Sequence, residues 1–261
     1  MTENKIKKVV IFAGGEGTRL AELTEKTPKP LVNIGPDPVI VHIMRHFYRA
    51  GYREFVIAVG YKSIEFKRYF RDYVLAKRDV TFTKNDIQVK DSNDVEDWIV
   101  HVVETGEKST TAQRLNAVAP YIDGEPFFLT YGDTVSDVDL KKLEEVHFSR
   151  PEGNLATLTA VNIEERFGIL KLNKETGAVD KFSEKSSDKE NMINGGFIVC
   201  NPELLNEVNE NSGDFSHETL NRLGDENKLS FYRHDGFWSA MDTKRDNDKL
   251  NKLYVTNPEL F

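Results

Sequence analysis

Short apolar runs alternate with amphipathic stretches along the first half of the chain. The apolar runs predict buried strands and cover 7–15, 54–61, 98–105 and 125–133. The amphipathic stretches predict helices over 39–52, from Ser63 onward, and over 111–122, and a hairpin is expected between 79–83 and 87–92. Because strands and helices alternate with crossovers of this length, the pattern predicts a parallel, doubly wound α/β sheet.

The second half of the chain is richer in strand patterns. Segments 154–161 and 192–200 each have strand character, and 168–185 predicts two strands joined by a Lys-Glu-Thr-Gly turn. A polar helix is predicted from Thr243 onward. Because no repeat, low-complexity tract or linker separates the halves, we expect a single domain, 1–261, with a small β-rich lobe.

Composition narrows the class of protein. The chain has 261 residues, 39% of them hydrophobic, and no apolar stretch approaches the roughly 20 residues that cross a bilayer. The N-terminal apolar run, Val9 to Ala13, is too short for a signal peptide, so we expect a cytoplasmic protein. A net charge of −8 argues against a nucleic-acid partner. Cys200 lies in an apolar run and is expected to be a buried, inert thiol.

The stretch FAGGEGTRL at 12–20 follows directly on the first apolar run. Its glycines do not complete the dinucleotide pattern, and no Gly-Lys-Ser/Thr follows for a P-loop. A tight turn alone would explain three glycines. Arg19 lies just after them, however, and the segment TPKP at 27–30 holds Lys29 between two prolines that restrict its backbone. Glycine N–H groups with two positioned cations favour a triphosphate site.

FAGGEGTRL together with TPKPLVNIG resembles the signature of sugar-1-phosphate nucleotidylyltransferases. Further segments, among them YGDTVSDVDL, INGGFIV and YRHDGFWSAMDTKRD, are similar in order and spacing to the glucose-1-phosphate cytidylyltransferases of that family. The resemblance implies the nucleotide-diphospho-sugar transferase fold, a Rossmann-like doubly wound mixed sheet with a small β-rich substrate lobe. It also implies transfer of a cytidylyl group from CTP to α-D-glucose 1-phosphate, which gives CDP-glucose and pyrophosphate for surface-polysaccharide (dideoxyhexose) precursors.

The resemblance implies roles for individual residues, with 1–150 mainly binding nucleotide, 151–242 mainly binding sugar phosphate, and 243–261 as a C-terminal helix. The nucleotide-binding residues would be Phe12, Ala13, Gly14, Gly15, Glu16, Gly17, Thr18, Arg19, Lys29, Ser109, Arg114 and Gly132. The sugar-phosphate residues would be Gly168, Glu184, Lys185, Asn194 and Gly195. The catalytic residues would be Arg19, Lys29, Asp133 and Asp242.

Two of these aspartates are candidate metal ligands. Asp133 ends the apolar strand 125–133, and open α/β sheets bind ligands at the carboxyl ends of their strands. Asp242 is the second carboxylate of the Mg²⁺ site that the resemblance implies, together with phosphate oxygens and water. Taken singly, each aspartate also fits a turn or a helix cap. Asp139 precedes the helical segment LKKLEEVH and is expected to cap it.

Three positions depart from the family pattern. Ala112-Gln113 stands where relatives have two glycines before the arginine, Ser186 replaces a proline, and Met192 replaces a tryptophan. The first departure concerns nucleotide or subunit contacts, and the other two concern the sugar side. Another nucleotide, UTP or dTTP, or another sugar 1-phosphate therefore stays open as an alternative. A catalytically silent binding module of the same fold is disfavoured by the intact catalytic set.

The histidines are not expected to act as metal ligands or catalytic bases. His42 and His46 are four residues apart on the helix 39–52, and without an evident third ligand they are expected to be a surface pair. His234 is expected to be a pocket wall or a structural hydrogen-bonding residue. The resemblance further implies a homo-oligomer, with a hexamer as one candidate, in which Arg114 reaches the nucleotide of a neighbouring subunit.

Overall fold

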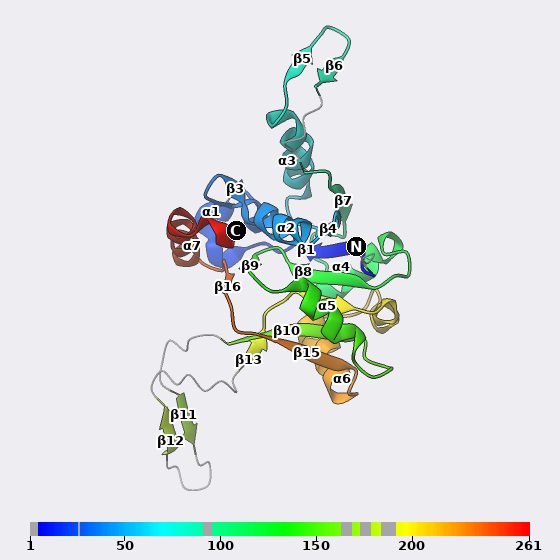
Figure 1. The fold of residues 1–261 in the computed structure, drawn as a ribbon, viewed down its shortest axis with the longest axis vertical. Coiled ribbons are helices and arrows are strands. Elements are labelled where there is room, and N and C mark those ends of the chain that lie inside the picture. Colours follow the sequence, from blue (N-terminus) through cyan, green and yellow to red (C-terminus); the bar gives the residue numbers. More distant parts are fainter. Residues whose placement is uncertain (1–4, 26, 91–95, 163–168, 173–178, 184–191) are drawn as a thin grey trace.

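The structure is a computed structural model, and it describes residues 5–25, 27–90, 96–162, 169–172, 179–183 and 192–261. Within these residues one eight-stranded sheet runs through the centre of the molecule (Figure 1). Its strands in spatial order are β13 (Met192–Asn194), β10 (Ala156–Asn162), β14 (Ile198–Cys200), β8 (Phe127–Tyr131), β1 (Lys8–Phe12), β4 (Glu54–Val59) and β7 (Ile99–Glu104), with β15 (Leu229–His234) paired to β10.

The sheet is parallel on one side and mixed on the other. β1 pairs in parallel with β4 and β8, and β4 pairs in parallel with β7. This side confirms the doubly wound pattern predicted from the first half of the sequence. β14 then pairs antiparallel with β8 and β10, so the strands of the second half are continuous with the same sheet.

Helices cover both faces of the sheet because successive strand residues point to opposite sides. Val9 and Ile11 of β1 pack into one buried cluster, and Val10 and Phe12 pack into the other. The first cluster includes residues of α2 (Val39–Arg49), α3 (Ser63–Ala76), α5 (Leu140–Phe148) and α7 (Lys244–Thr256). The second includes residues of α4 (Thr111–Val118), the π-helical turn Phe215–Leu220 and α6 (Asn221–Asp225).

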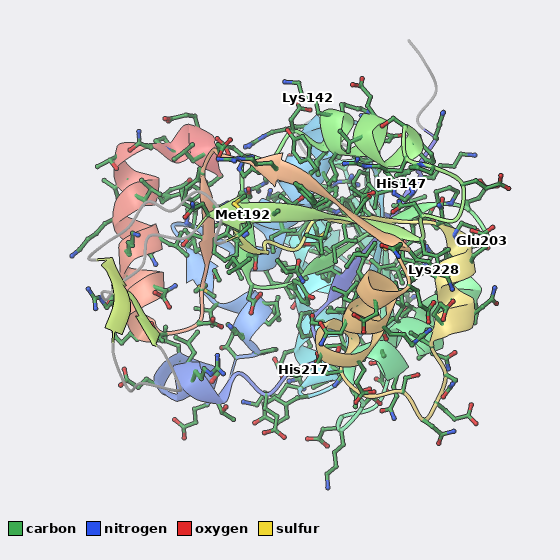
Figure 2. All side chains as sticks on the ribbon, turned by 90° about the horizontal axis from the view of Figure 1, so that it is seen from below. Lys142, His147, Met192, Glu203, His217 and Lys228 are labelled. Atoms are coloured by element: carbon green, nitrogen blue, oxygen red, sulfur yellow. The ribbon has the colours of Figure 1, made fainter. Side chains whose placement is uncertain are left out.

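Helix α5 has one side exposed to solvent and one side packed against the sheet. Lys142 is exposed on its outer side, whereas His147 lies between α5 and the strands below it (Figure 2). The His147 imidazole Nδ1 is 2.9 Å from the Thr157 hydroxyl of β10. Asp139 caps this helix by accepting a hydrogen bond from the Lys142 amide, which confirms the expectation for that aspartate.

Smaller elements lie off the main sheet. The hairpin of β5 (Val80–Phe82) and β6 (Ile87–Val89) extends from the far end of α3, and the hairpin of β11 (Ile169–Leu172) and β12 (Val179–Ser183) lies at the opposite end of the molecule (Figure 1). Two short ribbons pair β2 (Asn33–Ile34) with β3 (Asp37–Pro38), and β9 (Thr134–Ser136) with β16 (Trp238–Ala240). The remaining short helices are α1 (Ala21–Thr24) and the 3₁₀ turns Thr18–Leu20, Lys29–Leu31, Ala119–Tyr121, Pro202–Glu207 and Pro258–Leu260.

Most predicted elements are confirmed with small changes at their ends. Helix α2 stops at Arg49, and Gly51 has φ +95°, the left-handed conformation expected of a helix-terminating glycine. The helix from Ser63 and the hairpin after it are also confirmed. Cys200 is fully buried, and burial raises the pKa of its thiol. Among the described helices, none is long and apolar enough to cross a membrane.

The expectation that His42 and His46 form a surface pair is wrong. His42 is 3% exposed and contacts the Ile34 carbonyl at 2.7 Å, while the His46 Nε2 lies 2.9 Å from the Val138 carbonyl. Burial lowers the pKa of both imidazoles. Both side chains therefore pack α2 against its neighbours and are not available as a metal-binding pair.

Candidate active site

Three residues that are far apart in the sequence meet at one point beyond the ends of β1 and β8. The ammonium of Lys29 lies 2.7 Å from Asp133 Oδ2 and 2.6 Å from Asp242 Oδ1. The lysine side chain is 12% exposed, and those of the two aspartates are 29% and 46% exposed. The structure thus brings together three of the four residues predicted to be catalytic.

The β9–β16 ribbon explains why the two aspartates are neighbours. Ala240 of β16 pairs with Thr134 of β9, and the Met241 amide donates to the Asp133 carbonyl at 2.9 Å. Asp133 and Asp242 therefore lie at the same end of the ribbon. Gly132 brings Asp133 close to β1, because its amide donates to the Phe12 carbonyl and an added Cβ would lie 2.9 Å from that oxygen.

Lys29 lies on a restricted backbone, as the sequence predicts. It begins a 3₁₀ turn, with Pro28 before it and Pro30 after it, and proline fixes φ at both places. The glycine stretch packs directly against this turn. Gly17 has φ +64°, and a Cβ added there would lie 3.1 Å from Lys29 Cβ. A side chain at Gly17 would be strained and crowded, which explains the need for glycine at this position.

The electrostatics of the cluster favour a cation between the two carboxylates. Burial opposes the charge of Lys29, but Asp133 and Asp242 outweigh it and hold the lysine pKa above its ordinary value. Two carboxylate oxygens thus already converge on a single positive group. Oxygen ligands of this kind are what Mg²⁺ prefers, so the chemistry of Asp133 and Asp242 fits the magnesium site that the family resemblance implies.

The glycine stretch presents an open surface next to this cluster. Phe12, Ala13 and Gly14 are buried at the end of β1. The exposed residues are Gly15, Glu16, Thr18 and Arg19. Within the described part of the chain Arg19 forms no ion pair, which leaves its guanidinium available for an anionic ligand.

The resemblance implies that Arg114 contacts a nucleotide, and this stays a prediction. In this structure the Arg114 side chain is 4% exposed and packs against the backbone of the glycine stretch. The guanidinium donates hydrogen bonds to the carbonyl oxygens of Gly14, Val59, Gly106 and Glu107 and to the hydroxyl of Thr105. In this conformation Arg114 supports the loops from within and does not face the open site.

Ala112 and Gln113, which stand where relatives have two glycines, also have a structural explanation. Ala112 is fully buried, and Gln113 completes a capping box at the start of α4, where its Oε1 accepts from the Thr110 amide at 2.9 Å. The Gln113 Nε2 donates to the Glu210 carbonyl at 2.8 Å, so both ends of the amide are engaged. Ser109 donates to the Thr105 carbonyl. Gln113 is therefore a structural residue here and is not positioned to contact a base.

Of the predicted sugar-phosphate residues, Asn194 and Gly195 are described, and Gly168, Glu184 and Lys185 lie outside the described residues, as does Ser186. Asn194 accepts from the Gly196 amide at 3.0 Å and donates to the Tyr131 hydroxyl at 3.3 Å. Met192 begins β13, two residues before Asn194 (Figure 2).

Two aromatic residues that the sequence analysis missed hold this part of the site. The Tyr131 hydroxyl, at the end of β8, lies 2.6 Å from Ser216 Oγ, and the Trp238 indole donates to the Gly195 carbonyl at 2.8 Å. Trp238 also lies where a Cβ on Gly195 would approach its Nε1 to 3.1 Å. The position of Tyr131 directly before Gly132-Asp133, at the end of a predicted strand, could have indicated from the sequence that it lies near the site.

His234 has a structural role. Its Nε2 lies 3.0 Å from Asp137 Oδ1, 3.1 Å from the Phe237 carbonyl and 3.3 Å from Ser136 Oγ. All three contacts are to the same nitrogen, so Ser136, His234 and Asp137 are not arranged as a catalytic triad. They instead fasten β15 to the β9–β16 ribbon that carries Asp242.

Comparisons with known proteins agree with this geometry. Residues 8–246 match the family model described as nucleotidyl transferase. The glucose-1-phosphate cytidylyltransferases of Salmonella typhi and Salmonella typhimurium are each 42% identical over 250 residues, which is 95% of this chain and 95% of each relative. A UTP-bound UGPase from Acinetobacter baumannii shares the fold, with a TM-score of 0.68 and 16% identity over 98% of this chain and 95% of that chain. The chain therefore belongs to the nucleotidyl transferase family.

Proposed function

We propose that this protein transfers a cytidylyl group from CTP to α-D-glucose 1-phosphate and forms CDP-glucose and pyrophosphate. The observation that carries the proposal is the 42% identity, over nearly the whole length, to proteins named glucose-1-phosphate cytidylyltransferase. The meeting of Lys29, Asp133 and Asp242 beside the glycine stretch supports a phosphate-transfer site in the same place.

In the proposed reaction a phosphate oxygen of glucose 1-phosphate forms a bond to the α-phosphorus of CTP. The bond from that phosphorus to the β-phosphate bridging oxygen breaks, and pyrophosphate leaves with the electron pair. The attacking oxygen is already anionic, so no side chain needs to remove a proton. The protein's contribution is to position the two substrates and to stabilise the charge that develops at phosphorus.

The described residues have distinct roles in this proposal. Lys29 and Arg19 bind the triphosphate, and the exposed backbone of the glycine stretch contacts the nucleotide. Asp133 and Asp242 hold Mg²⁺, which neutralises phosphate charge when it is bound. Once phosphates are present, the Lys29 ammonium exchanges its carboxylate partners for phosphate oxygens, so the same two aspartates become free to act as metal ligands.

We assign nucleotide binding mainly to 1–150 and sugar-phosphate binding mainly to 151–242. Asn194 and Gly195 line the sugar side, where Tyr131 and Trp238 hold them in place. That this protein forms a homo-oligomer stays a prediction from the family resemblance.

The proposal is tested by mixing the protein with each nucleoside triphosphate and a set of sugar 1-phosphates, and then identifying the nucleotide sugar that accompanies pyrophosphate release.

Replacing Lys185 with alanine is expected to weaken binding of glucose 1-phosphate about tenfold or more, because a charge-assisted contact worth about 1.5–3 kcal/mol is lost. The affinity for CTP is expected to stay largely unchanged. Calorimetric titration with each ligand separates the two effects. Lys244→Ala is the matched control, since Lys244 is an exposed lysine that pairs with Asp248 on α7. Equal losses for CTP and for the sugar phosphate would contradict the assignment.

A further inference from the structure

The imidazole of His234 lies where the end of β15 meets the β9–β16 ribbon, and it is 8% exposed. Its Nε2 lies 3.1 Å from the Phe237 carbonyl, 3.0 Å from Asp137 Oδ1 and 3.3 Å from Ser136 Oγ. A carbonyl or an ionised carboxylate only accepts hydrogen bonds, so Nε2 carries a proton and is the donor. A buried nitrogen that already donates to protein acceptors is not available as a catalytic base.

The Phe237 carbonyl is the acceptor on which these contacts converge. Besides His234, the Asp137 amide donates to it at 3.1 Å and the Ser136 hydroxyl donates to it at 2.7 Å. Three donors, two from the end of β9 and one from β15, thus fix the direction of a single peptide group. Trp238 follows this group and begins β16, so the direction of the peptide determines how β16 pairs with β9.

Glycine at position 236 is required for this arrangement. A Cβ added to Gly236 would lie 2.6 Å from Asp137 Oδ1 and 2.7 Å from His234 Cε1. Both contacts are too short for real atoms, so a side chain at this position would push the carboxylate and the imidazole apart. The sequence His-Asp-Gly-Phe at 234–237 therefore acts as one unit, in which the histidine supplies the donor, the glycine the space and the phenylalanine the acceptor.

The two strands of the ribbon are supported differently. β9 lies against α2, where His46 Nε2 is 2.9 Å from the carbonyl of Val138, just after the strand. Among the described strands, β16 pairs with β9 alone. A two-stranded ribbon with three residues in each strand is marginally stable by itself. The position of β16 therefore depends on how its first peptide is held.

The ribbon connects this peptide to Asp242, which lies at the other end of β16. A slip of β16 by one residue would move Asp242 about 3.3 Å along the strand and turn its neighbours to the opposite face. The contact of 2.6 Å between Asp242 Oδ1 and the Lys29 ammonium would then be lost, and with it the convergence on Asp133.

We propose that His234 is a positioning residue for Asp242. Its hydrogen bond to the Phe237 carbonyl fixes the register of β16 on β9, and this register places the second carboxylate of the metal site beside Asp133. His234 itself touches neither metal nor substrate. The inference rests on the proposed function only for the metal role of the two aspartates, and not for the identity of the nucleotide or the sugar.

The test is titration of the nucleotide-free protein with Mn²⁺, a spectroscopic substitute for Mg²⁺, with free Mn²⁺ measured by electron paramagnetic resonance. His234→Ala is expected to weaken Mn²⁺ binding about tenfold, the lower end of the roughly 10- to 100-fold loss typical when the support of a metal ligand is removed. His234→Gln is expected to recover most of the affinity, because the glutamine amide nitrogen can donate to the same carbonyl. The titrations are repeated on a Lys29→Ala background, where no ammonium lies between the carboxylates.

A double-mutant cycle shows whether His234 acts through Asp242. Asp242→Asn is expected to weaken Mn²⁺ binding by itself. Because a misplaced ligand and a missing ligand cause the same loss, adding His234→Ala to Asp242→Asn is expected to change the affinity by less than about twofold. Independent losses that multiply in the double variant would overturn the inference, since His234 would then act by another route.

His147→Ala is the matched control. His147 is also a buried histidine, and its Nδ1 contacts Thr157 of β10, outside the ribbon. Thermal unfolding is expected to show lower stability in both alanine variants, whereas Mn²⁺ affinity falls only in His234→Ala. The inference is overturned if folded His234→Ala binds Mn²⁺ within about twofold of wild type, or if His147→Ala weakens binding equally. Should His234→Ala not fold, wild-type Mn²⁺ affinity in both Ser136→Ala and Gly236→Ala overturns it.

Failure of this inference is distinct from failure of the proposed function. Mn²⁺ binding is measured without nucleotide or sugar, so it does not depend on which nucleotide sugar the protein forms. If another nucleotide sugar is formed and His234→Ala weakens Mn²⁺ binding, the proposed substrates are wrong and the positioning role stands. If CDP-glucose is formed and His234→Ala leaves Mn²⁺ binding unchanged, only the positioning role is wrong.

Discussion

Asp133→Asn is expected to lower kcat by about 10²-fold or more, which is the scale of removing one preorganised charge-stabilising group. The substitution keeps the shape of the side chain but removes the charge that faces Lys29 at 2.7 Å and that would hold Mg²⁺. Initial rates of pyrophosphate release over a range of Mg²⁺ concentrations measure the effect. Thermal unfolding establishes that the variant is folded.

Asp139→Asn provides the control for this change. Asp139 follows the same strand end but caps α5 and lies outside the cluster, so its variant is expected to keep the wild-type kcat. Near-normal turnover of Asp133→Asn at saturating Mg²⁺ would show that the metal assignment is wrong.

Lys29→Ala has the second large expected effect, again a loss of about 10²-fold or more in kcat/KM, because a positioned cation no longer stabilises the charge on the triphosphate. In the nucleotide-free protein the same substitution is expected to strengthen metal binding, although it lowers activity. The ammonium lies between Asp133 and Asp242 there, so its removal is expected to tighten the binding of Mn²⁺, a spectroscopic substitute for Mg²⁺.

Steady-state kinetics measures the first effect, and electron paramagnetic resonance titration of free Mn²⁺ measures the second. Lys142→Ala is the control, since this lysine is exposed on the outer side of α5 (Figure 2). Full activity in Lys29→Ala would contradict the catalytic role of the lysine. Weaker Mn²⁺ binding in the nucleotide-free variant would show that Lys29 does not compete with a metal for the two carboxylates.

Much of the architecture follows from the sequence because its first half has clear periodicity. The buried strands are continuous apolar runs, and the helices between them have one apolar face. The type and order of these secondary-structure elements were therefore predictable. Local pattern cannot specify the β9–β16 ribbon, because its strands are three residues each and about a hundred residues apart. This ribbon brings Asp242 to Asp133, and only the family resemblance suggested that pairing.

Charged and polar residues on helices were harder to place. His42 and His46 look like a surface pair by spacing, but α2 is covered on two sides, by the sheet and by Tyr254 and Phe261 near the C-terminus. Arg114 likewise lies on the inner side of α4, where the ends of β1, β4 and β7 supply carbonyl acceptors. A sequence pattern does not contain these acceptors, since they come from three distant loops.

Selectivity for the base distinguishes cytidylyl transfer from the transfer of another nucleotide. Cytosine has an N4 amino donor where uracil and thymine have an O4 acceptor, and a buried mismatch of that kind costs about 1–3 kcal/mol. The measurement is kcat/KM for CTP, UTP and dTTP with glucose 1-phosphate at matched Mg²⁺. CTP is expected to be preferred by about 5- to 150-fold, with CDP-glucose as the product. If UTP or dTTP equals CTP within a factor of about three, a difference of less than 1 kcal/mol, the proposed cytidylyl transfer is contradicted.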